Sequence, residues 1–579
     1  MSDNSMLISG ATQRNWEKLN ISNSDKLKSR ANKSRSEKCI VPDNYISIDG
    51  LESIISQIKS LEYSDIDIFY ALCIQKLSLL HNNENVNRFL LEYKRDVNIK
   101  LDIPYVVLSD TKNDWLGFLY QTRIPEGKRN IRGQYYTNYS VVNNMLLDVV
   151  VSQNKSFLDP CCGTGAFLMN VRAESLSQLF GIDNDEIAVM ITKANLIALY
   201  PNDKQYPQVY CEDYLDDNIF TVSNIADKRF DYIYTNPPWG VSKIQNYFSD
   251  VICSSERSSL FFVKAFKQLK TNGQISFLMP SSLLKVKSHQ DFRSFILKNT
   301  NIKGLELYKE RFNGVFTDFF SIIAVKKGES SRSQSYFVKN EHNITWVTLT
   351  VEDCKTEIVL NNNEEEEILS IIEAFGVETL KDSSWALGVV TGDNKNKLKK
   401  EKVCGYEPIY TGKDIGKYLL NKPSNYILYD RTLLQQCAKD EYYRCSEKLV
   451  YKFISKSLCF AYDNTSSLFL NSANILIPNI KGMSIKTVLA FLNSELFSYY
   501  YLKKFSDIKV LKSNLMTLPF PSISEQQDWE ITKMVDLVLK GELQHIESIN
   551  NYIYSLYSLK PIIINKIKDE LYGSFDISA

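Results

Sequence analysis

Short apolar runs alternate with amphipathic helical segments through the middle of the chain. The expected elements lie in FLDPCCGTGAFLMNV (157–171), QLFGIDNDE (178–186), VYCEDYLD (209–216), DYIY (231–234), SSLFFVKAFKQLKTNG (258–273) and QISFLMP (274–280). The first predicts a strand, a glycine-containing turn and a helix, and 258–273 predicts a helix ended by Gly273. This alternation predicts an α/β fold with an open, mostly parallel, doubly wound sheet that binds ligands at the carboxyl ends of its strands.

Different patterns flank this region. Residues 51–61 place their apolar side chains on one helical face, so residues 40–122 as a whole predict a helical region. A polar stretch at 330–365 predicts a boundary, and residues 380–520 carry short β-like runs such as 426–430 and 447–455. Helices are expected again at 484–504 and 525–560.

A length of 579 residues predicts two or three domains. The expected division is a possible helix-turn-helix-like segment with a basic linker (1–40), a helical domain (41–125), a catalytic domain (126–330), a boundary region (331–380) and an α+β domain with C-terminal helices (381–579).

The N-terminus offers two interpretations. Residues 7–20 resemble the second helix of small helix-turn-helix modules, but a plain capping helix explains them as well. The basic segment 24–38 is either a linker or an arm that contacts phosphates. The first residues lack a basic stretch followed by an apolar core, so no signal peptide is expected.

Composition narrows the class of protein. Hydrophobic residues make up 44% and charged residues 23%, which is ordinary for a folded domain, and no apolar run approaches the ~20 residues of a membrane span. Eleven cysteines without a C-x-x-C and four scattered histidines predict reduced thiols, no metal site and a cytoplasmic location. Basic and acidic residues both number 68, so nucleic-acid binding would require basic residues gathered on one face.

The first chemical signal is Asp159-Pro160 followed by Gly163-Thr164-Gly165 at the start of a helix. Glycines there allow a ligand to approach the backbone closely. The P-loop lysine and the third glycine of the dinucleotide fingerprint are both missing, which argues against a phosphate ligand. Asp183 after the next strand can accept from ribose hydroxyls, and Asp213 after the one beyond can accept from an adenine amine. Acidic side chains without a phosphate clamp fit an adenosine that lacks phosphates, such as S-adenosylmethionine, whose sulfonium is cationic.

The second signal is Asn236-Pro237-Pro238-Trp239 at a strand end. The Asn236 amide oxygen and the Pro237 carbonyl can each accept one N–H bond from an exocyclic amine, and Trp239 can stack on a planar ring. An ordinary Asn-Pro turn explains the tetrapeptide alone equally well.

Taken in order, the motifs GQYYTNYSVV (133–142), LDPCCGTG, GIDND, CEDYL and NPPW resemble those of class I S-adenosylmethionine-dependent amino-methyltransferases. Specifically, the chain resembles the gamma-class DNA adenine-N6 methyltransferases of restriction-modification systems. The resemblance implies direct methyl transfer to a flipped-out adenine of double-stranded DNA. It implies cofactor contacts by Tyr136, Thr137, Asp159, Pro160, Gly163, Gly165, Asp183, Asp213 and Asn236, and base contacts by Asn236, Pro237, Pro238, Trp239 and Phe316.

Some neighbouring residues have plainer interpretations. Asp185 is expected to start a helix. Phe312, Phe319 and Phe320 are expected in the core, and Phe316 facing the base rests on the match of FNGVFTDFFSIIAVKK (312–327) to the family.

The second half resembles the target-recognition region of the same methyltransferases and of type IIG enzymes. Its lysines are expected to contact phosphates and Tyr499–Tyr501 to add aromatic surface, although a solvated surface is the alternative. The lysines are Lys395, Lys397, Lys399, Lys400, Lys448, Lys452, Lys456, Lys503, Lys504, Lys509 and Lys512.

Other functions remain open at this point. NPPY/W loops also occur in enzymes that methylate RNA or a protein glutamine, and a non-catalytic DNA-recognition subunit would keep the same domains. Glu92-Tyr93-Lys94 has the E-x-K form of metal-dependent nucleases, with Pro42-Asp43 upstream. A bifunctional type IIG enzyme therefore requires Glu92 and Lys94 to lie on a strand beside another carboxylate, whereas 86–95 predicts a helix. A separate restriction endonuclease or defence subunit is the expected protein partner.

Overall fold

The computed structural model describes residues 51–96, 99, 101–125, 137–216, 225, 228–241, 251–308, 318–328, 333–340, 343–350, 358–455, 457–505 and 509–572. The chain divides into two compact units, with the break between residues 362 and 363. The helix-turn-helix-like segment, the basic linker, Tyr136, Phe316 and Lys456 lie outside the described residues.

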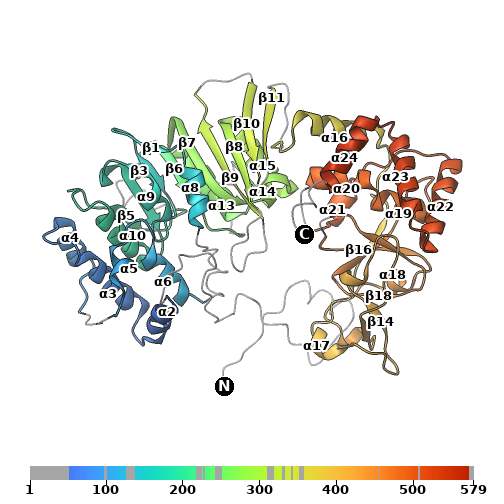
Figure 1. Ribbon diagram of the computed structural model, residues 1–579, viewed down its shortest axis with the longest axis horizontal. Helices are drawn as coiled ribbons and strands as arrows, with labels where there is room; N and C mark the ends of the chain where they lie inside the picture. Colours follow the sequence, from blue (N-terminus) through green and yellow to red (C-terminus); the bar gives the residue numbers. More distant parts are fainter. Residues whose placement is uncertain are drawn as a thin grey trace. The chain divides into compact units, whose positions relative to one another are not determined.

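The first unit is built on a nine-stranded sheet, whose strands β6 to β11 lie side by side in Figure 1. Its order is β11-β10-β8-β9-β7-β6-β2-β4-β5. The strands are β2 (Phe157–Asp159), β4 (Leu179–Asp183), β5 (Gln208–Cys211), β6 (Phe230–Thr235), β7 (Leu269–Pro280), β8 (Thr300–Tyr308), β9 (Phe319–Lys326), β10 (Ser333–Lys339) and β11 (Ile344–Thr350). From β5 to β7 all pairs are parallel, and β9 runs antiparallel to both β7 and β8. The predicted open, mostly parallel sheet is therefore confirmed.

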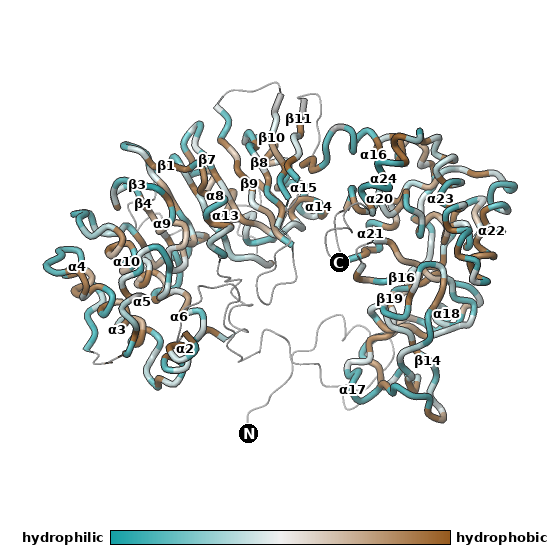
Figure 2. The backbone as a smooth tube through the Cα atoms, in the orientation of Figure 1, coloured by the Kyte–Doolittle hydropathy of each residue, from teal (hydrophilic) through white to brown (hydrophobic). Residues whose placement is uncertain are grey.

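Helices cover both faces of this sheet. Successive residues of a strand point to opposite faces, so each strand contributes apolar side chains to both layers of helices. Leu158, Ile233 and Phe277 pack on one face against α13 (Arg257–Lys267), α14 (Ser282–Lys285) and α15 (Gln290–Asn299). Phe157 and Tyr234 pack on the other against α8 (Tyr139–Leu146), α9 (Ala166–Asn170) and α10 (Glu186–Leu199). Strands buried on both faces explain the nearly uninterrupted apolar runs, and the brown stretches of Figure 2 lie along them. A small parallel pair, β1 (Val150–Val151) and β3 (Arg172–Ala173), lies beside them.

The helical region predicted before residue 122 is present and shares a core with the sheet domain. Its helices are α2 (Leu51–Ser60), α3 (Asp65–Leu77), α4 (Glu84–Glu92), α5 (Tyr105–Ser109) and α6 (Trp115–Arg123). Met190, Ile191 and Ala194 of α10 are buried in one cluster with Phe69 and Phe118 of these helices. Helix α10 is buried on nearly all sides because it packs against the sheet on one side and against the helical region on the other.

One boundary prediction is wrong. Helix α13 ends at Lys267, not at Gly273, and Gly273 lies inside the long strand β7. The pattern of apolar residues continues past Lys267 because Leu269 is buried as well, so the sequence predicts a helix that is too long. Its main chain already pairs with Phe230 of β6, so the strand begins where the pattern still predicts helix.

The second unit contains two four-stranded sheets, ordered β12-β19-β16-β17 and β13-β15-β14-β18. Their strands are β12 (Ser384–Leu387), β13 (Leu398–Lys399), β14 (Glu407–Tyr410), β15 (Asn425–Ile427), β16 (Lys448–Lys452), β17 (Phe460–Asp463), β18 (Leu468–Phe469) and β19 (Ala473–Ile477). Val450 and Ile475 face the second sheet, whereas Leu449 and Leu476 face the helices. The first sheet therefore lies between two hydrophobic cores.

The helices of this unit are α16 (Asn363–Phe375), α17 (Asn394–Lys397), α18 (Asp440–Arg444), α19 (Ile485–Asn493), α20 (Glu495–Phe505), α21 (Lys512–Leu515), α22 (Glu525–Leu539), α23 (His545–Leu556) and α24 (Pro561–Tyr572). The predicted helix at 525–560 is two helices, because the chain turns at Gly541, whose φ is +100°.

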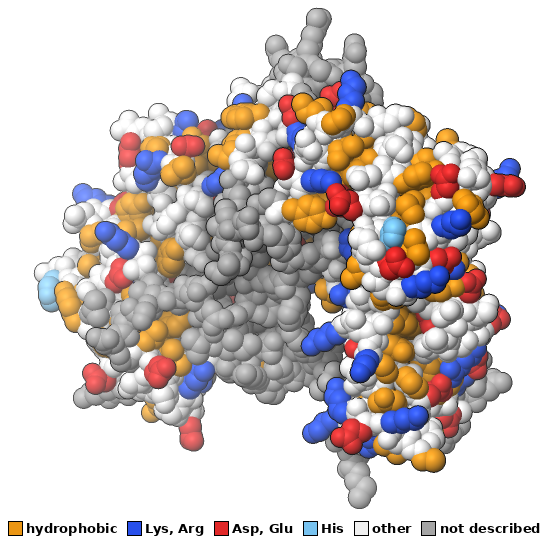
Figure 3. Space-filling model, turned by 45° about the vertical axis from the view of Figure 1, so that its right-hand side comes forward, with side chains coloured by type: hydrophobic (Ala, Val, Ile, Leu, Met, Phe, Trp, Pro, Cys, Tyr) orange, Lys and Arg blue, Asp and Glu red, His pale blue; other side chains and the backbone are white. Residues whose placement is uncertain are grey.

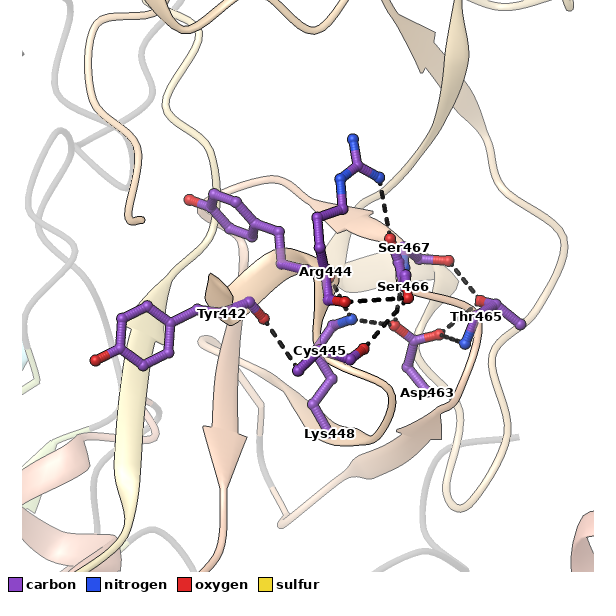
Figure 4. A network of polar contacts seen from close by, with 9 residues as sticks. Tyr442, Arg444, Cys445, Lys448, Asp463, Thr465, Ser466 and Ser467 are labelled. Carbon is purple, nitrogen blue, oxygen red and sulfur yellow. Dashed lines mark hydrogen bonds and ion pairs between the residues drawn. The ribbon is translucent and has the colours of Figure 1, made fainter. Parts of the chain in front are cut away.

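A buried ion pair fixes the turn that follows β17 against the end of α18. Lys448 Nζ lies 2.6 Å from Asp463 Oδ2, and both side chains are fully buried. Lys448 also donates to the Tyr443 carbonyl, while Thr465 and Ser467 bond the same carboxylate. Figure 4 shows how these bonds, together with those of Ser466, hold the 463–467 turn against residues 442–445. The predicted phosphate contact of Lys448 is therefore wrong, because that ammonium group is enclosed in the protein.

Candidate active site

The candidate site lies where the strand order reverses. The chain proceeds from β2 to β4 and β5 on one side and then to β6 and β7 on the other, so the order reverses between β2 and β6, the place where open α/β sheets bind their ligands. Asp159 ends β2, Asp183 ends β4 and Asn236 follows β6. Parallel pairing of these strands brings the three residues to one edge of the sheet.

The loop between β2 and α9, called the glycine loop below, requires glycine at two positions. Gly163 has φ +52° and Gly165 has φ +100°, both in the left-handed region. A Cβ at Gly165 would also lie 3.1 Å from the Thr192 side chain of α10. Thr192 donates from Oγ1 to the Gly163 carbonyl at 2.8 Å, so the loop is fixed to α10.

Asp159 is buried at the end of β2. Its Oδ1 accepts from Thr235 Oγ1 at 2.6 Å and from the Cys161 N–H at 3.2 Å. Burial raises the pKa of Asp159 to about 7, although these hydrogen bonds favour the ionised form. Thr235, the last residue of β6, thus joins the ends of β2 and β6 directly. Sequence reasoning missed Thr235 because it reads as an ordinary strand residue.

Asp183 holds the loop that follows β4 to the glycine loop. Its Oδ2 accepts from the Gly163 N–H at 2.8 Å and its Oδ1 from the Asp185 N–H at 3.0 Å. Burial raises the pKa of Asp183 to about 6. Asp213 is exposed just after β5, where its Oδ1 accepts from the Leu215 N–H at 3.0 Å. Asp185 caps α10, as predicted.

Asn236 is held by its side-chain amide. Its Nδ2 donates to Thr137 Oγ1 at 2.9 Å. Since the amide nitrogen is turned toward Thr137, the amide oxygen is the atom that can accept from a substrate amine. The two residues are 99 positions apart in the chain, and both were predicted site residues.

The far end of the Asn236–Trp239 loop is fixed by two other bonds. Trp239 Nε1 donates to the Leu278 carbonyl at 3.2 Å, and the Trp239 ring lies 5.7 Å from that of Phe319. Buried Glu256, which begins α13, accepts from the Gly240 N–H at 2.9 Å. Phe319 and Phe320 are core residues, as predicted. Glu256 carried no sequence signal, because its role depends on a backbone contact 16 residues away.

The bond between Thr137 and Asn236 gives a first test. Thr137→Val removes the hydroxyl that orients the amide, so kcat at saturating cofactor should fall about tenfold. Thr137→Ser keeps the hydroxyl and should stay near the wild-type rate. Steady-state methyl transfer measures both. Equal rates for the valine and serine variants would contradict this role of the bond.

The set of polar groups at the ends of β2 and β4 fits S-adenosylmethionine. Two buried carboxylates, Asp159 and Asp183, suit a ligand that carries a sulfonium and an ammonium group. Asp183 can accept from ribose hydroxyls. A buried carboxylate would repel a phosphate at the same place.

A nuclease role for Glu92-Tyr93-Lys94 would require Glu92 and Lys94 to lie on a strand, and the structure does not meet this requirement. Glu92 is the last residue of helix α4, not part of a strand. Its two carboxylate oxygens bond Lys193 Nζ at 2.5 Å and the Tyr206 hydroxyl at 2.6 Å. Within the described residues, no three His, Cys, Asp or Glu side chains are grouped so that they could hold a metal ion.

Some of the predicted phosphate-binding lysines of the second unit are exposed, whereas others are held by carbonyl or carboxylate groups of the protein. Lys395, Lys399 and Lys512 are exposed, and Figure 3 shows Lys and Arg side chains on the part of this unit around α17 and β14. Lys397 donates to the carbonyls of Thr391 and Leu433. Lys503 pairs with Glu365 and Glu570, and Lys504 with Glu373.

The prediction that Tyr499–Tyr501 add aromatic surface is wrong. Tyr499 is 0% exposed and Tyr501 is 4% exposed, because α20 lies in the core of the helical layer. Exposed aromatic residues in this unit lie elsewhere, for example at Trp529.

Comparison with known families identifies both units. Residues 112–397 match the N-6 DNA Methylase family, and residues 407–520 match the TaqI-like C-terminal specificity domain. The chain carries an N-6 DNA Methylase domain followed by a TaqI-like specificity domain. It is accordingly an adenine-specific DNA methyltransferase of the restriction-modification type that uses S-adenosylmethionine as its methyl donor.

Individual relatives agree with this family. The chain is 27% identical over 358 residues to the type II methyltransferase M.VspI of Vibrio sp. (strain 343), covering 58% of this chain and 83% of that protein. It is 25% identical over 300 residues to the type II methyltransferase M.HincII of Haemophilus influenzae, covering 48% of this chain and 50% of that protein.

A solved structure has a similar fold over most of the chain. The type IIL restriction-modification enzyme MmeI, solved in complex with DNA, superposes with a TM-score of 0.61 at 12% identity over 88% of this chain and 95% of that one. None of the described helices of this protein combines the length and the apolar character that crossing a membrane requires.

Proposed function

We propose that this N-6 DNA methylase transfers a methyl group to N6 of an adenine that is flipped out of a specific site in double-stranded DNA. The observation that carries the proposal is the position of Asn236. It follows β6 at the switch point, where β2 and β4 end in the buried carboxylates of Asp159 and Asp183. Its amide nitrogen donates to Thr137, which sets the orientation of the amide group, and its amide oxygen is an acceptor of the kind that an exocyclic amine requires.

The chemistry follows from positioning. The Asn236 amide oxygen and the Pro237 carbonyl each accept one N–H bond from the adenine amine, which turns the nitrogen lone pair out of conjugation with the ring. When bound, S-adenosylmethionine supplies the methyl group on a cationic sulfur. We assign the ring contacts to Trp239 and Phe316, and Pro238 keeps the loop rigid. The amine proton is lost as the C–N bond forms, so no strong base is required.

The cofactor residues are proposed on the same basis. Asp159, Pro160, Gly163 and Gly165 form the loop beside the methionine part, together with Tyr136 and Thr137. Asp183 accepts from the ribose hydroxyls and exposed Asp213 from the adenine amine of the cofactor. Both buried carboxylates are already fixed by backbone N–H donors, so their oxygens keep their direction when a ligand arrives.

The raised pKa values of Asp159 and Asp183 predict a pH-dependent cofactor affinity. Ionised carboxylates bind the cationic cofactor, so its Kd should rise as pH falls through the pKa values of about 7 and about 6. Calorimetric titration between pH 8 and pH 5.5, a range chosen around those values, measures it. A Kd that does not change over this range would contradict the assignment.

The same shifts have the opposite consequence for the ligand-free protein. In the native state both carboxyl groups keep protons that the unfolded chain releases above its ordinary carboxyl pKa of about 4. Stability should therefore fall as pH rises from about 4 through about 7, and thermal unfolding followed over that window measures the change.

We assign the choice of DNA site to the second unit, whose residues 407–520 match a specificity domain. Exposed lysines around α17 and β13, such as Lys395 and Lys399, can bind phosphates, so affinity should fall steeply with salt. A separate restriction endonuclease is the partner we propose, since the E-x-K motif of this chain begins at the last residue of helix α4 and not on a strand. We place the enzyme in the cytoplasm, with the DNA that it modifies.

Tritiated S-adenosylmethionine tests the proposal against its alternatives. Label should enter adenine-containing duplex DNA and remain absent from RNA and protein. Label in RNA or in a protein glutamine would favour those substrates instead. Folded protein that binds cofactor but labels none of several genomic DNAs would contradict the proposal and favour a non-catalytic recognition subunit.

A further inference from the structure

Helix α6 (Trp115–Arg123) of the helical region reaches the cofactor side of the sheet domain. Asp114, its N-cap residue, has no exposed surface and lies 50 positions before Thr164 of the glycine loop in the sequence. Thr164 Oγ1 donates to Asp114 Oδ2. Asp114 Oδ1 accepts from Asn195 Nδ2 of α10 at 2.8 Å and from the Gly117 N–H at 2.9 Å. One buried carboxylate thus joins α6, α10 and the glycine loop.

The approach between α6 and the glycine loop is close. A Cβ on Gly117 would lie 1.9 Å from Asp114 Oδ2 and 2.2 Å from Thr164 Oγ1. Such contacts are impossible without displacing one of these groups, so only glycine fits here. The contact is therefore part of the fold and not a loose meeting of surfaces.

The same helix holds two more loops of the cofactor side. The Tyr120 hydroxyl donates to Asp185 Oδ2 at 2.8 Å, and Asp185 lies two residues after Asp183. The Asp114 N–H donates to the hydroxyl of Tyr139, which begins α8 two residues after Thr137. Tyr120 is 6% exposed. The glycine loop, the loop after β4 and the segment after Thr137 are thus all fastened to α6.

From these contacts we infer that α6 forms a wall of the cofactor site, and that Asp114 and Tyr120 are positioning residues that set the affinity for S-adenosylmethionine. The inference rests on the proposed cofactor roles of Gly163, Asp183 and Thr137. Neither residue needs to touch the cofactor. Each acts by fixing a loop whose backbone or carboxylate does.

Charge supports this arrangement. Burial raises the pKa of Asp114, while hydrogen bonds from Thr164, Gly117 and Asn195 favour its ionised form. Lys76 of α3 is 1% exposed, donates to the Asp110 carbonyl at 2.8 Å and contributes a positive charge near Asp114. A buried carboxylate with this many donors is costly to disturb. Its geometry is accordingly well determined.

Two variants and a matched control test the inference in the full chain. Tyr120→Phe removes only the bond to Asp185, and Asp114→Asn replaces the oxygen that accepts from Thr164. Each should raise the Kd for S-adenosylmethionine about tenfold, the cost of one hydrogen bond to a charged group. Because the methylation chemistry is untouched, kcat at saturating cofactor should stay within about twofold and the Kd for DNA should not change.

Thr122→Val is the control. Thr122 is fully buried in the same helix, and its hydroxyl donates to the Leu119 carbonyl at 2.7 Å, away from all three loops. It should lower the melting temperature but leave the cofactor Kd unchanged. Wild-type Kd values in both test variants, with melting temperatures lowered as in the control, would overturn the role of α6. A wild-type protein that does not bind S-adenosylmethionine would instead overturn the proposed function, and this inference with it.

Discussion

Asn236→Ala should abolish methyl transfer while leaving the protein folded. The substitution removes the amide oxygen that we assign to the adenine amine and the bond to Thr137 that orients it. Loss of a preorganised hydrogen-bond group at a reacting centre costs about a hundredfold to a thousandfold in rate, so we expect a fall in kcat of about a thousandfold. Single-turnover transfer of tritiated methyl groups measures the chemical step directly.

Affinity measurements separate this result from misfolding. The Kd for duplex DNA should be unchanged, and the Kd for S-adenosylmethionine should change by less than about threefold, because Asp159 and Asp183 remain. Asn343→Ala, at an exposed asparagine beside β11, is the matched control and should keep wild-type activity. A rate within tenfold of wild type in Asn236→Ala would remove Asn236 from the catalytic site.

Asp183→Ala should weaken cofactor binding more than any other single change discussed above. The carboxylate has two structural bonds, to the Gly163 and Asp185 N–H groups, and is the proposed acceptor for the ribose hydroxyls. Losing both roles should raise the Kd for S-adenosylmethionine about a hundredfold. Calorimetric titration measures it.

The control for this prediction is Asp148→Ala, an exposed carboxylate in the same unit. Its Kd should equal that of the wild-type protein. The Asp183 variant should also lose part of the pH dependence, since the group with the pKa of about 6 is gone. An unchanged Kd in Asp183→Ala would place the ribose elsewhere.

Much of the sheet domain could be predicted from local sequence. Strands β2, β4 and β6 are short apolar runs followed by a turn residue, and the chain order of strands and helices then allows few topologies. Asp185 was predicted as a helix start because caps are local. The left-handed φ of Gly165 follows the same logic, since the turn into α9 demands it.

Contacts between distant segments could not be predicted in this way. Asp114 and Tyr120 lie in a segment that the sequence indicates only as part of a helical region, and nothing nearby indicates that Thr164 or Asp185 is their partner. Burial of charged and aromatic side chains could not be predicted from local sequence either. Lys448 looks like a surface lysine until Asp463 is brought beside it by pairing of β16 with β17.

The family assignment and the site assignment rest on different observations. The family follows from matches across residues 112–397 and 407–520. The roles that we propose for individual residues are argued from geometry at the switch point, where Thr235 joins Asp159 to β6 and Thr137 holds Asn236. Variants at these positions therefore test the site without testing the family.

The most direct measurement is a map of modified adenines. Unmethylated DNA is incubated with the purified full chain and S-adenosylmethionine, its nucleosides are analysed by mass spectrometry, and modified positions are located by single-molecule sequencing. We expect N6-methyladenine within one recurring sequence context, and none with Asn236→Ala. Folded, cofactor-binding wild-type protein that leaves every DNA without N6-methyladenine would contradict it.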